Sequence, residues 1–200
     1  MRDILYNPFR YIAGTKALLL GLVVIIITSL LTYNFSIIFE NTLRIRFVPD
    51  TAPLWVFFLN NFLNWLSIAF FLYLFGILIS KSRIRFIDVL GTQALARFPL
   101  ILYSLIGFFP AGGKYNRLTL RSFMEGETVN FAGFDVWIFL ILSLLGTFVI
   151  IWYIFLMYNA YSISCNLKKE KGVISFISAI VIGGFFSRVI YLTIVAKIIG

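Results

Sequence analysis

The chain has 200 residues and a mean hydropathy of +0.99, with 61% hydrophobic and only 12% charged residues. Soluble domains carry about 25% charged residues, so this composition excludes a soluble enzyme, a disulfide scaffold and a disordered tail. The sequence has no histidine and one cysteine, Cys165. A Cys/His zinc site, an internal disulfide and hydrolysis by a nucleophile and histidine are therefore excluded. The composition predicts an integral membrane protein that holds no cofactor.

The net charge is +9, and the isoelectric point is about 9.9. In a soluble chain this excess of lysine and arginine would suggest nucleic acid as a partner. In a membrane protein it is better explained by positively charged cytoplasmic loops and by attraction to anionic lipids. We therefore expect contact with membrane lipids, anionic lipids included, and no nucleic acid.

Residues 1–16 are more polar than the stretch that follows them. Asn7 and Pro8 predict the start of a short helix, and Phe9 suits the headgroup layer of a membrane. A secretory signal peptide is the alternative, but the segment contains Asp3 and no small-residue cleavage site follows it. We interpret it as a short interfacial segment before an uncleaved anchor.

Five apolar stretches follow that are long enough to cross a membrane, since a bilayer core about 30 Å thick needs about 20 apolar residues in a helix. The spans are expected at about 17–39, 54–80, 89–110, 136–158 and 173–199. They are apolar on every side and lack the alternation of a β-barrel. The sequence predicts an all-α, polytopic membrane helix bundle, forming a single membrane domain over residues 1–200.

The loops indicate how the bundle is oriented. With a cytoplasmic N-terminus, the inner loops hold nine Lys and Arg in 37 residues and the outer loops six in 49. The inner segments are 1–16, 81–88 and 159–171, and the outer segments are 34–53, 111–135 and 197–200. Since positively charged loops stay in the cytoplasm, we expect the N-terminus inside and the C-terminus outside.

The second span carries amides on one face. Asn60, Asn64 and Ser67 are separated by four and three residues, which places them on the same side of a helix. They either join helices through hydrogen bonds worth about 0.6 kcal/mol each or line a polar path for a substrate. The joining role is favoured.

Arg97 lies near the middle of the third span, about 13 Å beyond Asp88. No Asp, Glu or His lies well inside a predicted span, which argues against a proton-coupled transporter. The guanidinium must then bond to Gln93, to the asparagines of span two, to backbone carbonyls or to a lipid phosphate. The candidate intramembrane polar site is Asn60, Asn64, Gln93 and Arg97, in which Arg97 is either a structural anchor or a contact for a lipid or ligand.

Pro99 predicts a kink in this third span. Proline lacks a backbone N–H, so a continuous helix would leave the carbonyl of Leu95 without its usual donor.

The fifth span carries small residues at four-residue spacing. Without large side chains in the way, a neighbouring helix can approach closely along such a stripe. We predict a helix-packing seam made of Ser175, Ala179, Gly183 and Ser187. Arg188 lies on the adjoining face, from which it can extend to the headgroups.

Three stretches, NPFRYIAGTKALLLGL, VLGTQALARFPLIL and YNAYSISCNLKKEKGVISFISAIVIG, together with the five spans, resemble the Yip domain family in its compact bacterial form. The family is named for interaction with Rab-type (Ypt) GTPases. The resemblance implies a five-span protein of a bacterial cytoplasmic membrane, with the N-terminus inside. It implies no established chemistry.

Two functions remain open. The first is a non-enzymatic multi-pass membrane protein that organises membrane or binds a partner, either a membrane protein or a second copy of itself. The second is a small transporter or lipid-handling protein, in which the polar residues of spans two and three line a cavity. A polar cavity open to one side would favour the second function, and a dry bundle with an apolar lateral groove would favour the first. An enzyme is not expected, because no acid–base pair is present in the spans.

Overall fold

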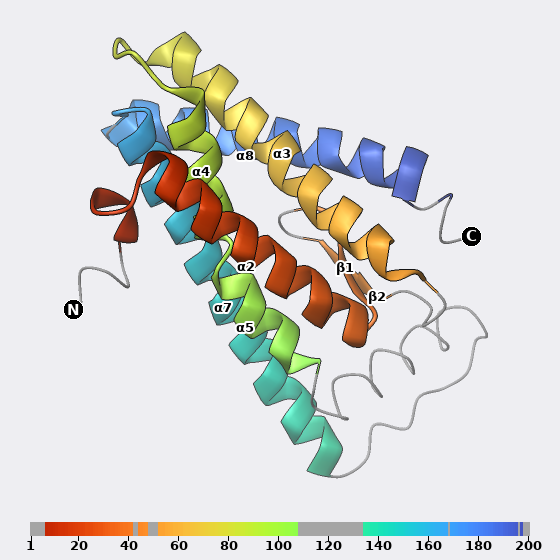
Figure 1. Ribbon diagram of the computed structural model, residues 1–200. Helices are drawn as coiled ribbons and strands as arrows, with labels where there is room; N and C mark the ends of the chain where they lie inside the picture. The colour runs from red at the N-terminus through yellow and green to blue at the C-terminus, as the bar shows by residue number, and fades with distance from the viewer. Residues whose placement is uncertain are drawn as a thin grey trace.

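The computed structural model describes residues 7–41, 44–47, 52–107, 134–167, 169–195 and 197. Within them, five helical segments are long and apolar enough to cross a membrane, which confirms the all-α, multi-pass prediction (Figure 1). The elements in chain order are the 3-10 helix η1 (Pro8–Arg10), α2 (Gly14–Asn34), β1 (Ile37–Phe39), β2 (Ile45–Phe47), α3 (Leu54–Ile79), α4 (Phe86–Ala96), α5 (Pro99–Ile106), α7 (Phe134–Ser164), α8 (Lys169–Ile190) and the π-helical turn η2 (Tyr191–Val195).

The helices differ from the predicted spans at their ends. Helix α2 stops at Asn34, although the apolar stretch continues to Phe39, because those last residues form a strand. Helix α7 continues to Ser164, six residues past the predicted end. Hydropathy marks the part of a helix that suits hydrocarbon and not where its backbone hydrogen bonds end. The predicted end of span three, at residue 110, lies outside the described residues.

The N-terminal segment packs against the bundle through a short helical turn. Pro8 starts a single 3-10 turn, but the Asn7 side chain makes no capping hydrogen bond. Phe9 is only 1% exposed and packs in the main apolar core. Tyr11, beside it, is 69% exposed. This turn therefore anchors the chain to the bundle through one buried ring.

The backbones of helices α2 and α4 approach each other closely. A Cβ atom on Gly21 would lie 2.6 Å from the backbone nitrogen of Leu95, and one on Gly91 would lie 2.7 Å from the nitrogen of Leu18. Only glycine fits at such distances, so these two residues set the α2–α4 spacing. Neither glycine was predicted to be a packing residue.

The third span is interrupted between α4 and α5. The N–H of Arg97 donates to the Ala94 carbonyl at 3.3 Å, and the N–H of Phe98 donates to the Leu95 carbonyl at 3.1 Å. These shorter-range bonds replace the α-helical pattern for one turn, and α5 then begins at Pro99. The predicted kink is present, but the Leu95 carbonyl is not left free, because the turn tightens and supplies Phe98 as its donor.

A two-stranded ribbon lies beside α3 (Figure 1). Strands β1 and β2 pair antiparallel, with Phe39 opposite Ile45, and the N–H of Glu40 donates to the carbonyl of Arg44 at 2.9 Å. The side chains of β1 are 1–2% exposed. The ribbon was not predicted, since its residues were assigned to the end of span one and to an outer loop.

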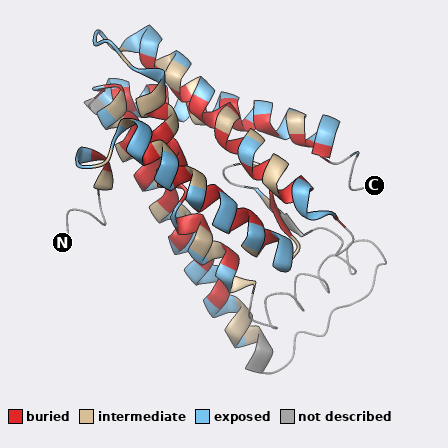
Figure 2. Cartoon of the chain, viewed as in Figure 1, coloured by how far each residue is buried: buried red, intermediate tan, exposed pale blue. Residues whose placement is uncertain are grey.

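The buried residues lie on the sides of the helices that face one another, and the outward faces are exposed (Figure 2). Large apolar residues dominate those outward faces, including Leu19 on α2, Phe148 on α7 and Phe185 on α8, which are 61–71% exposed. Such surfaces suit lipid and would be unusual against water. The protein is therefore an integral, multi-pass membrane protein.

Candidate functional site: the polar cluster around Arg97

Arg97 occupies the break between α4 and α5 and is 2% exposed. Its Nη1 donates to Oδ1 of Asn64 at 3.4 Å, and its Nη2 donates to Oδ1 of Asn61 at 3.3 Å. In the described part of the chain it has no carboxylate partner, and its Nε has no hydrogen-bond partner. Two neutral amides from α3 thus hold a buried cation.

The same amides connect α3 to other elements. The Nδ2 groups of Asn60 and Asn64 both donate to the backbone carbonyl of Phe39, each at 3.0 Å. The Nδ2 of Asn61 donates to Oγ of Ser29 on α2 at 3.2 Å. One hydrogen-bonded cluster therefore joins α2, the ribbon, α3 and the α4–α5 break. We call Ser29, Asn60, Asn61, Asn64 and Arg97 the polar cluster.

Gln93 is separate from this cluster. Its Nε2 donates to the carbonyl of Met157 on α7 at 3.0 Å, and its Oε1 has no partner among the described residues. One residue earlier on α4, Thr92 shares a 2.8 Å hydrogen bond with Ser164 of α7. Gln93 thus joins α4 to α7, whereas Arg97 joins the end of α4 to α3.

The structure therefore brings together three of the four predicted polar residues. Asn64 bonds directly to Arg97, and Asn60 is joined to Asn64 through a shared carbonyl. Sequence reasoning missed Asn61, because it considered a single helical face. An arginine has two terminal nitrogens that each require an acceptor. The amide of Asn61, next to Asn60 in the sequence, could therefore have been predicted as a second acceptor for Arg97. Ser67 lies outside the cluster and bonds to its own helix at Leu63.

A carboxylate just beyond the first predicted span is buried by the protein. The side chain of Glu40 is 1% exposed, and its Oε2 pairs with Nε of Arg44 at 3.0 Å. Ser187 of α8 donates its Oγ to the backbone carbonyl of Glu40 at 3.2 Å. Glu40 follows β1 and lies in none of the five candidate spans, so the prediction that no Asp, Glu or His lies well inside a span is unchanged.

The small-residue stripe of α8 faces other elements along its length. A Cβ atom on Gly183 would lie 3.4 Å from Cα of Ile68 on α3, an ordinary contact. Ser175 accepts a hydrogen bond from the hydroxyl of Tyr161 at 3.0 Å, and Ser187 reaches the ribbon. Ala179 is fully buried. A packing seam along Ser175, Ala179, Gly183 and Ser187 stays a prediction, and its approach is looser than that of α2 to α4.

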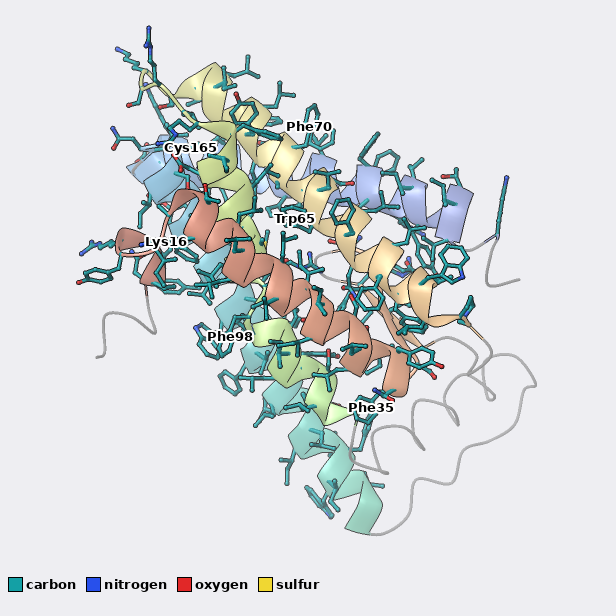
Figure 3. The ribbon with its side chains drawn as sticks, in the orientation of Figure 1. Lys16, Phe35, Trp65, Phe70, Phe98 and Cys165 are labelled. Atoms are coloured by element: carbon teal, nitrogen blue, oxygen red, sulfur yellow. The ribbon has the colours of Figure 1, made fainter. Side chains whose placement is uncertain are left out.

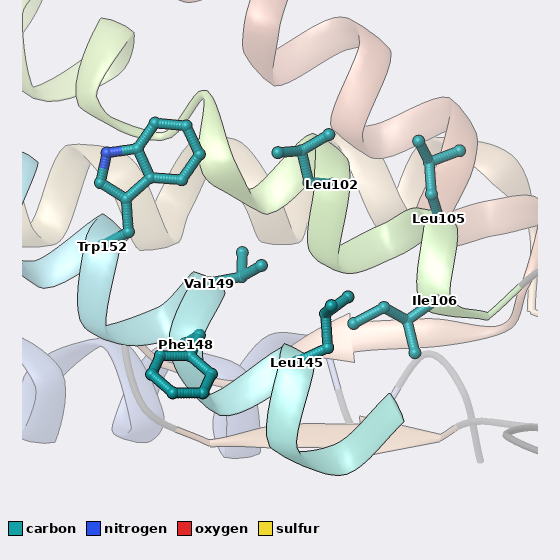
Figure 4. A pocket seen from close by; sticks show the side chains of 7 residues that line it. All are labelled: Leu102, Leu105, Ile106, Leu145, Phe148, Val149 and Trp152. Atoms are coloured by element: carbon teal, nitrogen blue, oxygen red, sulfur yellow. The ribbon is translucent and has the colours of Figure 1, made fainter. Parts of the chain in front are cut away.

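An apolar groove of about 540 Å³ lies between α5 and α7. It is lined by Leu102, Leu105, Ile106, Leu145, Phe148, Val149 and Trp152 (Figure 4). The rings of Phe98 and Trp152 pack edge to face near one end of the groove, with their centroids 6.0 Å apart. Figure 3 labels Phe98, and also Trp65 on α3. We call this feature the lateral groove. It holds no polar side chain apart from the indole of Trp152.

Cys165, labelled in Figure 3, follows α7 and is fully buried beside Gly76. Burial raises the pKa of its thiol to about 12. Because the thiolate is the reactive form, this cysteine should be inert at neutral pH. In the described part of the chain, no group of three or more His, Cys, Asp or Glu residues is placed to hold a metal ion.

Comparison with protein families matches the Yip1 domain over residues 2–190. Comparisons with curated proteins and with solved structures gave no match. The matched region contains the first four spans, helix α8 of the fifth, the ribbon and the polar cluster. It also contains Gly21 and Gly91, which lie within the first two stretches that carried the resemblance.

Proposed function

Since this chain belongs to the Yip1 domain family, we propose that it is a non-enzymatic multi-pass membrane protein that binds another membrane protein within the bilayer. The lateral groove is the site we assign to this partner. An occupant of the groove must be apolar, because six of its seven lining side chains are pure hydrocarbon. A helix of a second membrane protein, inserting leucine or phenylalanine side chains, meets that requirement.

The observation that carries this proposal is the contrast between the groove and the polar cluster. The amides that could have lined a substrate path are bonded to Arg97, to Ser29 and to the Phe39 carbonyl. The groove is open, apolar and lies on a different pair of helices. This combination supports partner binding more than passage of a polar substrate.

Photo-crosslinking from the groove tests the proposal. Benzoylphenylalanine at Leu105, a groove residue that is 43% exposed, should give a discrete protein adduct in native membranes. The same probe at Phe185, which is 71% exposed on α8, should give lipid adducts only. Lipid adducts alone at both positions, or identical protein adducts at both, would contradict the assignment of the groove.

A transporter or lipid-handling protein is the second candidate. It is supported by two polar atoms, Nε of Arg97 and Oε1 of Gln93, which are buried one helical turn apart without a partner among the described residues. Buried polar atoms of this kind are commonly completed by water. A water-filled path through the bundle would make the cluster accessible to small polar reagents.

We also infer a single membrane domain over residues 1–200, with the N-terminus in the cytoplasm and the C-terminus outside. The density of Lys and Arg in the loops supports this orientation. The resemblance of the three stretches to compact bacterial Yip proteins supports placement in a bacterial cytoplasmic membrane, in contact with anionic lipids.

A further inference from the structure

We infer that Arg97 positions helix α5, one wall of the lateral groove, and that Asn61 and Asn64 hold it in place. The groove is lined by other residues of α5 and α7, so these three side chains act on it only through α5. Their effect on partner binding rests on the proposed function, whereas the position of α5 is a property of this chain alone.

The α4–α5 break directs two neighbouring side chains to different helices. Arg97 donates to the amide oxygens of Asn64 and Asn61 on α3, at 3.4 and 3.3 Å. The next residue, Phe98, packs edge to face on Trp152 of α7, which lines the groove (Figure 4). The polar cluster and the groove are therefore one residue apart along the chain, although they lie on different pairs of helices.

The break is also hydrogen-bonded into the first turn of α5. The N–H of Leu100 donates to the carbonyl of Arg97 at 2.9 Å, and the N–H of Ile101 donates to the carbonyl of Phe98 at 3.1 Å. Bonds between residues three apart have poorer geometry than those of an α-helix, and such a stretch within a helix often marks a hinge. The direction of α5 therefore depends on where Arg97 is held.

Helix α5 is supported differently at its two ends. Just beyond its last residue, a Cβ atom on Gly107 would lie 2.8 Å from Cβ of Phe35, so this end packs closely against the residue that follows α2. At the other end, Arg97 ties the chain to α3. The groove leaves space between α5 and α7. Loss of the Arg97 bonds should therefore displace the end of α5 that carries Leu102 more than the end at Gly107.

Pulsed electron paramagnetic resonance between two spin labels measures this displacement in the full-length protein in membranes. The labels are placed at Leu102→Cys on α5 and Phe185→Cys on α8, since these residues are 39% and 71% exposed. Adding Arg97→Met should shift and widen the distance distribution of this pair. If that variant does not fold, Arg97→Lys replaces it, because a single ammonium lacks the planar fork that reaches both amides.

A second pair of labels, at Phe148→Cys on α7 and Phe185→Cys on α8, does not include α5. Its distances should stay the same when Arg97 is replaced. An unchanged distribution for the Leu102 pair would overturn the inference. Equal shifts in both pairs would also overturn it, because they would show a distortion of the whole bundle.

Gln93→Met is the matched control variant. It removes a buried polar side chain from the same helix, one turn before Arg97, and breaks the hydrogen bond of Gln93 to α7. Because α4 is held against α2 by the close approaches at Gly21 and Gly91, this variant should leave the distances from Leu102 unchanged. A shift as large as that of Arg97→Met would show that any polar loss in α4 moves α5, which would overturn the inference.

Photo-crosslinking in the Arg97→Met protein tests the consequence for binding. If α5 keeps its position for only about a tenth of the time, the apparent affinity for the partner falls about tenfold. The protein adduct from benzoylphenylalanine at Leu105 should decrease accordingly, and an undiminished adduct would overturn the effect on binding. If the unmodified protein gives no adduct, the proposed function fails, and the spin-label distances still decide whether Arg97 positions α5.

Discussion

Gly21→Ala should destabilise the protein by about 1–3 kcal/mol or more, the range found for overpacked cores. The added Cβ would lie 2.6 Å from the backbone nitrogen of Leu95 and also against Ala94. Backbone atoms cannot rotate away as a flexible side chain can, so α2 and α4 would have to separate along their length. The effect is measured by heating the purified protein in detergent and monitoring the loss of its monodisperse peak.

Gly184→Ala is the matched control for this prediction. It makes the same substitution in a helix of the same bundle, but no atom lies within 4 Å of the new Cβ. Alanine favours helix over glycine by about 1 kcal/mol, so the control should be neutral or slightly stabilising. Equal unfolding temperatures for the two variants would show that the α2–α4 approach is not a tight contact.

Asn64→Leu should be destabilising by about 3 kcal/mol. The leucine is similar in size, but it removes an acceptor from the Arg97 guanidinium and one of two donors to the Phe39 carbonyl. Hydrogen bonds to charged groups contribute about 1.5–3 kcal/mol, and a buried charge left short of partners costs more. Thermal unfolding in detergent again provides the measurement.

The double variant Asn64→Leu/Arg97→Met shows whether the cost arises from the charge. Arg97→Met alone should be nearly neutral, because removing a buried cation offsets the loss of its bonds to Asn61 and Asn64. In the double variant no charge remains to be satisfied, so it should be more stable than Asn64→Leu alone. Strictly additive effects would show that Asn64 and Arg97 do not act as a pair.

Part of this structure could be predicted from residues alone. Lengths of apolar sequence located the five spans, and the need of Arg97 for amide acceptors pointed to the asparagines of α3. The ribbon was missed because no charged residue separates Ile37–Phe39 from α2. Apolar and polar residues alternate in its second strand, which follows a polar stretch of sequence, and this pattern is typical of a hairpin.

The other omissions concern contacts between elements. A stripe of small residues within one helix drew attention to Gly183, but the approach of α4 to Gly21 of α2 is closer than that of α3 to Gly183. Such pairing depends on which helices meet, and periodicity within one segment does not contain that information. The burial of Glu40 was not predicted for the same reason, since it follows from the ribbon packing against other elements, including α8.

The central claim is that the polar cluster is dry and bonded to itself, so that the protein binds a partner and does not conduct a substrate. Thiol labelling in membranes opened to both sides tests it most directly. Ser29→Cys makes a conservative change inside the cluster, and Ser82→Cys lies on an exposed loop. Cys165 contributes no background, because it is buried and its thiol has a raised pKa of about 12.

A small water-soluble methanethiosulfonate should modify Ser82→Cys and leave Ser29→Cys unmodified. Unfolding the protein should then expose the Ser29→Cys thiol, which shows that the cysteine is intact. Modification of Ser29→Cys at a rate close to that of Ser82→Cys would reveal an aqueous path through the bundle, which would contradict the dry cluster and favour a transporter.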